Sequence, residues 1–125
     1  MGKIEKLSEA EKETMDIIWN LNRKVTSSEI MKIFNERRGK KWSAQTISTF
    51  LSRIVDKGIL KADREGRTNY YYSIVSKEEY ERDQAENILN NLYKGSLKNF
   101  LSALYYKKEV TEKEYEEINE WFSKK

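Results

Sequence analysis

The stretch from Ser43 to Lys57 presents a row of short polar side chains that could hydrogen-bond to another polar surface. One side of a helix with 3.6 residues per turn would carry Gln45, Ser48, Thr49, Ser52 and Asp56. The DNA major groove admits a helix and offers donors and acceptors to amide and hydroxyl groups of this kind. The other predicted helices of the chain carry long Lys and Glu side chains on their outer faces. We therefore interpret this face as a candidate DNA-reading surface.

Five short side chains of this helix are our candidates for contacts with base edges. They are Gln45, Thr46, Ser48, Thr49 and Ser52. A glutamine amide can form two hydrogen bonds with adenine, and a threonine methyl group can contact the methyl group of thymine. Ser43 precedes the helix, and its hydroxyl fits either an N-cap or a phosphate contact. The alternative interpretation of the set is an ordinary face turned to solvent.

Basic side chains lie close to this helix in the sequence and could contact DNA phosphates. The phosphate candidates are Arg37, Arg38, Lys40, Lys41, Arg53, Arg64 and Arg67, together with Ser43. Residues 1–75 hold 15 Lys and Arg against 10 Asp and Glu, whereas residues 76–125 hold 9 against 11. The first part is thus basic and the second part acidic, which favours contact of the first part with a polyanion. Basic loops that are merely solvated remain the alternative.

Capping signals predict two helices before the candidate reading helix. Ser8 with Glu11, and Thr26 with Glu29, have the spacing of capping boxes. They predict helices from residue 8 to about residues 20–22 and from residue 26 to about residue 35. Between the two, Val25 could form a stub of strand.

The candidate reading helix is bounded at both ends. Apolar residues recur at helical spacing from Ile47 to Val55 and predict an inward stripe. Ser43 is a suitable N-cap, and Gly58 stands where a left-handed residue would end the helix. With the preceding helix, this one forms a helix-turn-helix, in which Trp42 is expected to be a core residue.

After Gly58 the hydrophobic pattern changes to the period of a strand. Two runs, Ile59 to Arg64 and Asn69 to Val75, predict strands joined by a turn at residues 65–67. Among the three tyrosines at 70–72, alternation favours packing within the hairpin over stacking on bases. Residues 1–75 are therefore predicted to form a winged helix-turn-helix, and the whole chain is predicted to be mainly α with a small β-hairpin wing.

Residues 76–125 are predicted to form a helical dimerisation region. Ser76 with Glu79 and Thr111 with Glu114 have capping-box spacing, and Gly95 divides the segment. The candidate dimerisation residues are Ile88, Leu89, Leu92, Leu97, Phe100, Leu101, Leu104, Ile118 and Phe122. A three-helix segment of this size is marginal alone, so we expect its apolar faces to pack against a second copy. A two-fold dimer would place two reading helices on a palindromic operator.

The composition argues against enzymatic, metal-binding and membrane-spanning roles. The chain has 0 Cys and 0 His, which removes thiol chemistry, the commonest general base and the usual ligands of zinc, haem and iron–sulfur clusters. No nucleophile–base set stands out, so we expect no catalysis, no cofactor and no metal. No apolar run approaches the length of a membrane helix, and we expect a soluble cytoplasmic protein without membrane insertion.

Several motifs together resemble a known family of bacterial repressors. They are SEAEKETMDIIW at 8–19, W-S-x-x-T-I-x-T-x-L-x-R at 42–53, KG at 57–58, YYS at 71–73 and YKG at 93–95. This combination resembles the BlaI/MecI/CopY family. The resemblance implies a homodimeric winged-helix repressor of β-lactamase-type or related resistance genes, with the dimer interface in the C-terminal helices. It also implies induction by cleavage in that segment, signalled by a membrane-bound sensor protease.

The sequence departs from the family pattern at places that bear on operator and induction. Family cleavage falls at an Asn-Phe pair, and aligning residues 94–95 puts that bond at Ala103-Leu104, whereas an Asn99-Phe100 pair occurs four residues earlier. Family recognition helices resembling that of MecI carry basic residues where this chain has Gln45 and Ser48, so a different operator is expected. The copper-sensing branch uses C-terminal cysteines and is excluded by 0 Cys.

Two other functions fit the same elements. The first is a winged-helix regulator whose helical half is switched by a small ligand, which would shift melting of the protein without DNA. The second is a protein-interaction module without a DNA target. The Gln, Ser and Thr face argues against the second, because interface cores favour aromatic and apolar anchors.

Overall fold

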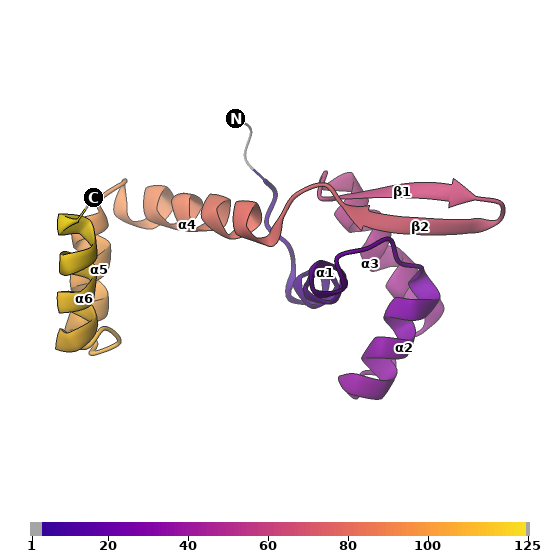
Figure 1. Ribbon diagram of the computed structural model, residues 1–125, viewed down its shortest axis with the longest axis horizontal. Helices are drawn as coiled ribbons and strands as arrows, with labels where there is room; N and C mark the ends of the chain where they lie inside the picture. Colours follow the sequence, from indigo (N-terminus) through magenta and orange to yellow (C-terminus); the bar gives the residue numbers. More distant parts are fainter. Residues whose placement is uncertain (1–3, 125) are drawn as a thin grey trace. The chain divides into compact units, whose positions relative to one another are not determined.

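The computed structural model of the chain describes residues 4–124 and contains the predicted succession of elements. In chain order these are α1 (Glu9–Leu21), α2 (Ser27–Arg37), α3 (Ala44–Asp56), β1 (Leu60–Glu65), β2 (Thr68–Ser73), α4 (Lys77–Tyr93), α5 (Leu97–Tyr106) and α6 (Glu112–Ser123) (Figure 1). The prediction of a mainly α chain with a hairpin after the third helix is confirmed. Helix α2 extends two residues beyond the predicted end at residue 35.

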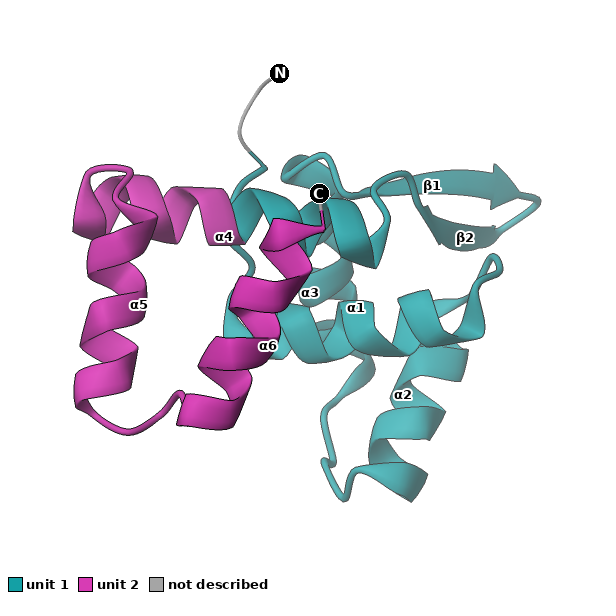
Figure 2. Ribbon diagram, turned by 60° about the vertical axis from the view of Figure 1, so that its left-hand side comes forward, with its two compact units in different colours: residues 1–84 teal, residues 85–125 magenta. Residues whose placement is uncertain are grey.

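The chain divides into two compact units whose boundary lies within α4. Unit 1 comprises residues 1–84 and unit 2 residues 85–125 (Figure 2). The first two turns of α4 belong to unit 1 because Tyr80 is buried in its core, with only 5% of its surface exposed. Between residues 4 and 124, no helix combines the length and apolar character needed to cross a bilayer.

The core of unit 1 is formed by the apolar stripes of its first three helices and the start of its hairpin. The fully buried apolar residues are Met15, Ile18, Val25, Ile30, Phe34, Ile47, Leu51, Ile54, Ile59 and Leu60. Each helix contributes residues three or four positions apart, which is the spacing that places them on one face. The inward stripe predicted for α3 is therefore confirmed, and α1 and α2 bury stripes of the same kind.

Side-chain caps fix where the first three helices begin. At α1, the Glu11 amide donates to the Ser8 hydroxyl and the Ser8 amide donates to the Glu11 carboxylate, and Thr26 with Glu29 repeats this arrangement at α2. Both predicted capping boxes are confirmed. At α3, Ser43 accepts a hydrogen bond from the Thr46 amide at 3.1 Å.

The two strands form an antiparallel hairpin with a tight turn. Leu60 pairs with Ser73 at one end and Glu65 with Thr68 at the other, so the turn is shorter by a residue than predicted. Gly66 occupies the turn with a φ of 64°, a left-handed conformation that glycine adopts without steric cost.

Residue 25 extends this small sheet and fixes the tyrosine faces. Val25 and Tyr71 exchange backbone hydrogen bonds of 2.9 and 2.7 Å, so the predicted strand stub is confirmed. Tyr71 is consequently buried, whereas Tyr72 lies on the other face, with the Lys24 ammonium 5.4 Å from its ring centre. Packing within the hairpin therefore accounts for both side chains.

Two helix starts in the second half differ from expectation. At α6 the Thr111 hydroxyl accepts from the Glu114 amide at 3.1 Å, but the Glu114 carboxylate contacts that hydroxyl rather than the Thr111 amide. The predicted capping box at this position is therefore wrong in its second half. Helix α5 begins at a cap that the sequence analysis missed, because Ser96 caps the Asn99 amide without an acidic partner at that position.

Unit 2 leaves most of its apolar surface unburied in a single chain. Helices α5 and α6 run in opposite directions, and neither has a buried residue (Figure 2). A groove of about 820 Å³ lies between them, lined in part by Leu97, Leu101, Tyr105, Tyr115, Ile118 and Phe122. Tyr106 is 88% exposed, and Leu92 on α4 is 72% exposed. A contiguous exposed apolar surface, rather than any single exposed side chain, is the feature that marks an interaction site.

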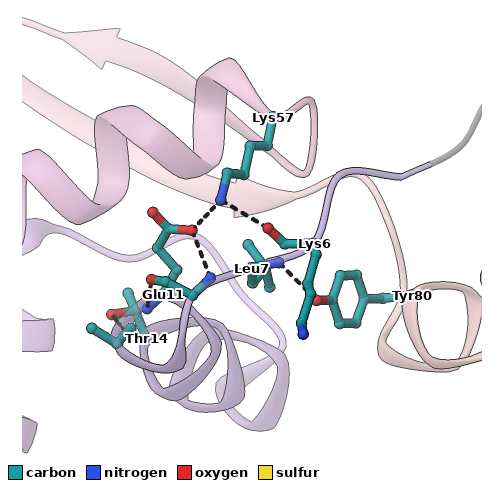
Figure 3. Close-up of polar contacts among 8 residues, drawn as sticks. Lys6, Leu7, Glu11, Thr14, Lys57 and Tyr80 are labelled. Atoms are coloured by element: carbon teal, nitrogen blue, oxygen red, sulfur yellow. Dashed lines mark hydrogen bonds and ion pairs between the residues drawn. The ribbon is translucent and has the colours of Figure 1, made fainter. Parts of the chain in front are cut away.

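A largely buried ion pair joins the start of α1 to the end of α3. The Lys57 ammonium contacts the Glu11 carboxylate and donates to the Lys6 carbonyl oxygen at 2.9 Å (Figure 3). The side chains of Glu11 and Lys57 are 3% and 21% exposed. Burial alone would raise the pKa of the Glu11 carboxyl, but hydrogen bonds from Lys57 and Ser8 outweigh it, and the pKa lies below its ordinary value.

Replacing Glu11 by Gln should test this ion pair through the pH dependence of stability. The variant keeps an oxygen that can accept from Ser8, but it loses the charge opposite Lys57, so unfolding free energy should fall by about 2 kcal/mol at pH 7. Because the folded-state pKa of Glu11 is depressed below 4.5, the stabilisation is complete above that pH and is lost as pH falls through the folded-state pKa. Urea unfolding from pH 7 to pH 3 should show the difference shrinking.

The matched control is Glu29→Gln, which changes the same position of the second capping box. Its cation partner, Arg23, has a side chain that is 52% exposed, so this loss should be smaller. A difference between wild type and Glu11→Gln that stays constant over this pH range would contradict the assignment.

Candidate nucleic-acid interface

Helix α3 is oriented by its apolar face, and its other face is thereby turned outward. Ile47, Leu51 and Ile54 are fully buried in the core of unit 1. On the opposite side, Gln45, Ser48 and Ser52 are exposed. The structure therefore places these three predicted reading residues on one outward row, at intervals of three and four residues.

The hydroxyl groups of the two threonines already have partners within the helix. Thr46 shares a hydrogen bond of 3.0 Å with the Ser43 hydroxyl, and Thr49 donates to the Gln45 carbonyl oxygen at 3.0 Å. Both threonines are half-buried. They can still offer methyl groups, but their hydroxyls are less available to a ligand than those of the exposed serines.

Gln45, Ser48 and Ser52 differ from the threonines in their hydrogen bonding. Within residues 4–124, their side chains form no hydrogen bond with another residue. Their amide and hydroxyl groups are thus free to donate to and accept from an external surface. Sequence alone could not separate these three from Thr46 and Thr49, because side-chain contacts with the helix backbone decide the difference.

An aromatic cluster fixes the turn that leads into α3. The Trp42 ring lies 4.6 Å from Phe34 and 4.9 Å from Phe50, measured between ring centres. Such pairs contribute roughly 0.5–1.5 kcal/mol each beyond their burial. They connect the end of α2 to the first half of α3, so Trp42 is a packing residue, as the sequence predicted.

Lys40 joins this cluster to α1. Its ammonium lies 5.0 Å from the Trp42 ring centre and 3.3 Å from a Glu13 carboxylate oxygen. The other Glu13 oxygen is buried and has no hydrogen-bond partner among the described residues. Lys40 is thus engaged in holding the turn, which limits its reach toward a phosphate.

The remaining basic candidates are distributed over three elements of unit 1. Arg37 ends α2, Arg38 and Lys41 follow it in the turn, and Arg53 lies on α3, all four exposed. On the hairpin, the Arg64 guanidinium donates to the Gly66 carbonyl oxygen at 3.1 Å, and that contact supports the turn. Arg67 is exposed beside it.

Lys24 is a contributor to the hairpin that the sequence analysis missed. Its ammonium pairs with Asp63 at 2.8 Å, which balances an acidic residue on β1. The pairing raises the pKa of Lys24 through its hydrogen bond to Asp63. The two residues are 39 positions apart, so no local pattern indicated the contact.

Comparison with protein families gives a match over nearly the whole chain. A family model described as "Penicillinase repressor" matches residues 7–124. The methicillin resistance regulatory protein MecI of Mammaliicoccus sciuri is 28% identical over 124 residues, covering 99% of this chain and 98% of that protein. The penicillinase repressor of Bacillus licheniformis is 30% identical over 122 residues, covering 98% and 91%.

Two solved structures are similar to about two thirds of the chain. The solution structure of the DNA-binding domain of the repressor BlaI has a TM-score of 0.54 and 34% identity, covering 64% of this chain and 94% of that one. The monomeric form of Bacillus licheniformis BlaI in complex with the blaP half-operator has a TM-score of 0.51, with the same identity and coverage.

Replacing Ser43 should separate its capping role from any role toward a ligand. Ser43→Ala removes the acceptor for the Thr46 amide and should lower the unfolding free energy by about 1 kcal/mol without DNA. Ser43→Asn retains a capping oxygen and should restore most of that loss, as measured by thermal and urea unfolding. Equal stability of wild type and Ser43→Ala would show that the cap contributes nothing.

Proposed function

Because the chain belongs to the penicillinase repressor family, we propose that it represses transcription as a homodimer bound to a two-fold-symmetric DNA operator. The family match covers residues 7–124 and bears out the resemblance inferred from the sequence motifs. Support for DNA as the ligand comes from the Bacillus licheniformis BlaI structure, which contains a half-operator and aligns with 64% of this chain.

The observation that carries the proposal is the outer face of α3. Gln45, Ser48 and Ser52 form an outward row of short side chains whose hydrogen-bonding groups are unused within the described chain. A helix with this face can lie close to base edges in the major groove and offer amide and hydroxyl groups to their donors and acceptors. We assign direct base reading to these three residues and methyl contacts to Thr46 and Thr49.

The phosphate contacts are assigned from two properties of each candidate side chain, namely its exposure and whether it already has an intramolecular partner. Arg37, Arg38, Lys41, Arg53 and Arg67 are exposed and are assigned to the DNA backbone. Such contacts position a protein on the duplex without specifying sequence. Ser43, Lys40 and Arg64 have intramolecular partners, so we assign them mainly to holding the helix start, the turn and the wing.

Dimerisation is assigned to the helical region from residue 76 onward. Its proposed interface residues are Ile88, Leu89, Leu92, Leu97, Phe100, Leu101, Leu104, Ile118 and Phe122. The absence of buried residues from α5 and α6 in the described chain supports this assignment, because a second copy would bury their apolar faces. Two coupled reading helices bind a palindrome far more tightly than one binds a half-site.

The resemblance to this family also directs the regulatory part of the proposal. We propose that the protein acts in the cytoplasm and regulates a resistance-type operon of the β-lactamase kind. Cleavage of the repressor, signalled by a membrane-bound sensor protease, is proposed to release it from DNA. The candidate bonds, Asn99-Phe100 and Ala103-Leu104, both lie within α5. Phe100 also packs on Tyr93 at 5.3 Å between ring centres. The helix must therefore open locally before either bond could be cut.

Removal of the free hydrogen-bonding groups of α3 should weaken discrimination between operator and random duplex. In Gln45→Ala/Ser48→Ala/Ser52→Ala, the ratio of affinities for operator and random duplex should fall at least about tenfold, since each good base contact contributes about 1–3 kcal/mol. Thr49→Val keeps the methyl group and loses only an internally bonded hydroxyl, so its ratio should remain close to that of wild type. Fluorescence anisotropy at fixed salt provides the measurement.

If the triple variant discriminated as well as wild type, α3 would not be the reading helix. Its affinity for random duplex serves as the internal control, because phosphate contacts are retained and that affinity should change little.

Neutralising the wing should affect all DNA sequences alike. Arg67→Gln should weaken binding to operator and random duplex by similar factors and reduce the slope of log affinity against log salt by about 1 per bound copy. Arg82→Gln, on an exposed position of α4, is the matched control and should leave the slope unchanged. An unaltered slope for Arg67→Gln would remove the wing from the interface.

A further inference from the structure

A short N-terminal strap, residues 4–7, lies between the end of α3 and the first two turns of α4. It forms neither helix nor strand, so its backbone polar groups need partners from side chains. The Lys6 carbonyl oxygen accepts from Lys57 at 2.9 Å, and the Leu7 amide donates to the Tyr80 hydroxyl at 2.9 Å (Figure 3). Lys57 comes from the end of α3 and Tyr80 from α4.

The strap continues along one face of α4. The Ile4 amide donates to the Asp83 carboxylate at 2.9 Å, and the Gln84 side-chain amide donates to the Ile4 carbonyl oxygen at 3.2 Å. Positions 80, 83 and 84 share a face because they are three and four residues apart. Three consecutive contacts therefore fix this turn of α4 against the strap.

The same turn of α4 also contacts Trp19 of α1, which is hydrogen-bonded to the base of the hairpin. The Tyr80 ring is buried 5.7 Å from the ring of Trp19, measured between centres. The Trp19 indole N–H donates to the Val75 carbonyl oxygen at 2.9 Å and contacts the Ser73 hydroxyl. Ser73 and Val75, which precede α4 in the chain, are thereby bonded to α1.

At its other side the strap is bonded to the end of the reading helix. Lys57 is the C-cap of α3, and its ammonium bonds both the strap and the buried Glu11 carboxylate. A continuous path of hydrogen bonds thus connects the end of α3 with Tyr80 on α4. A path of this kind resists rotation of α4 about its own start, because each bond has a required direction.

We propose, on the basis of the proposed function, that the strap fixes the direction in which α4 leaves unit 1 and so sets the half-site spacing that the dimer accepts. In this role Tyr80 and Gln84 are positioning residues that contact no DNA. Half-sites one helical turn apart are separated by roughly 34–36 Å, and each added base pair rotates one half-site by about 34–36°. A dimer therefore discriminates between half-site spacings only if α4, which connects each DNA-binding unit to the dimer interface, has a fixed direction.

The test uses the full chain and duplexes selected by wild type from a random pool. The variant is Tyr80→Phe/Gln84→Ala, which removes two contacts with the strap and keeps the buried ring and a good helix former. Affinities are measured for the selected two-fold-symmetric duplex, for a single half-site, and for duplexes with one or two base pairs inserted or deleted between half-sites. The expected result is an unchanged half-site affinity, about a tenfold weaker binding to the full duplex, and a smaller penalty for altered spacing.

Glu81→Gln, an exposed change on the same two turns, is the control and should match wild type throughout. Equal losses of affinity for the half-site and for the full duplex would overturn the positioning role, since they would indicate damage to the DNA-binding unit itself. An unchanged spacing penalty would overturn it as well. Failure of wild type to select any two-fold-symmetric duplex would instead contradict the proposed function, so the two failures are distinguishable.

Discussion

Burial of the apolar stripe of α3 is the constraint on which the rest of the arrangement depends. Ile47, Leu51 and Ile54 can be removed from water only if the helix turns its opposite side outward, so the core decides which residues are presented. The capping oxygen of Ser43 sets where the helix begins, and therefore which residue stands first in the outward row. One amphipathic pattern consequently determines both which residues of α3 pack in the core and which residues face outward.

Polar contacts between distant segments then hold this helix in place at both ends. At its start, Lys40 connects the aromatic turn to Glu13 on α1. At its end, Lys57 connects the C-cap to Glu11 and to the N-terminal strap. The carboxylates are partly or fully withdrawn from solvent, so each amine offsets a desolvation cost that would otherwise be substantial. Helix α1 therefore serves as the common support for both ends of α3.

Much of this fold could be predicted because its signals are local. Capping boxes, the period-3.6 stripes and the change to period 2 after Gly58 each depend on residues within a few positions of one another. The contacts that could not be predicted join residues far apart, such as Lys24 with Asp63 and Leu7 with Tyr80. For the candidate site, residue types indicated the face, but only side-chain geometry distinguishes Gln45 and the serines from the threonines bonded to their own helix.

That distinction bears on how such a protein changes over evolutionary time. Side chains that hold no bond inside the fold can be exchanged with little effect on stability, since surface substitutions of this kind usually change it by less than about 0.5 kcal/mol. Under the proposed function, Gln45, Ser48 and Ser52 form a set of positions where mutation can be tolerated structurally while the preferred DNA target changes. Lineages descending from one ancestral scaffold could diverge in the genes they control through changes at these positions alone, without compensating changes in the interior.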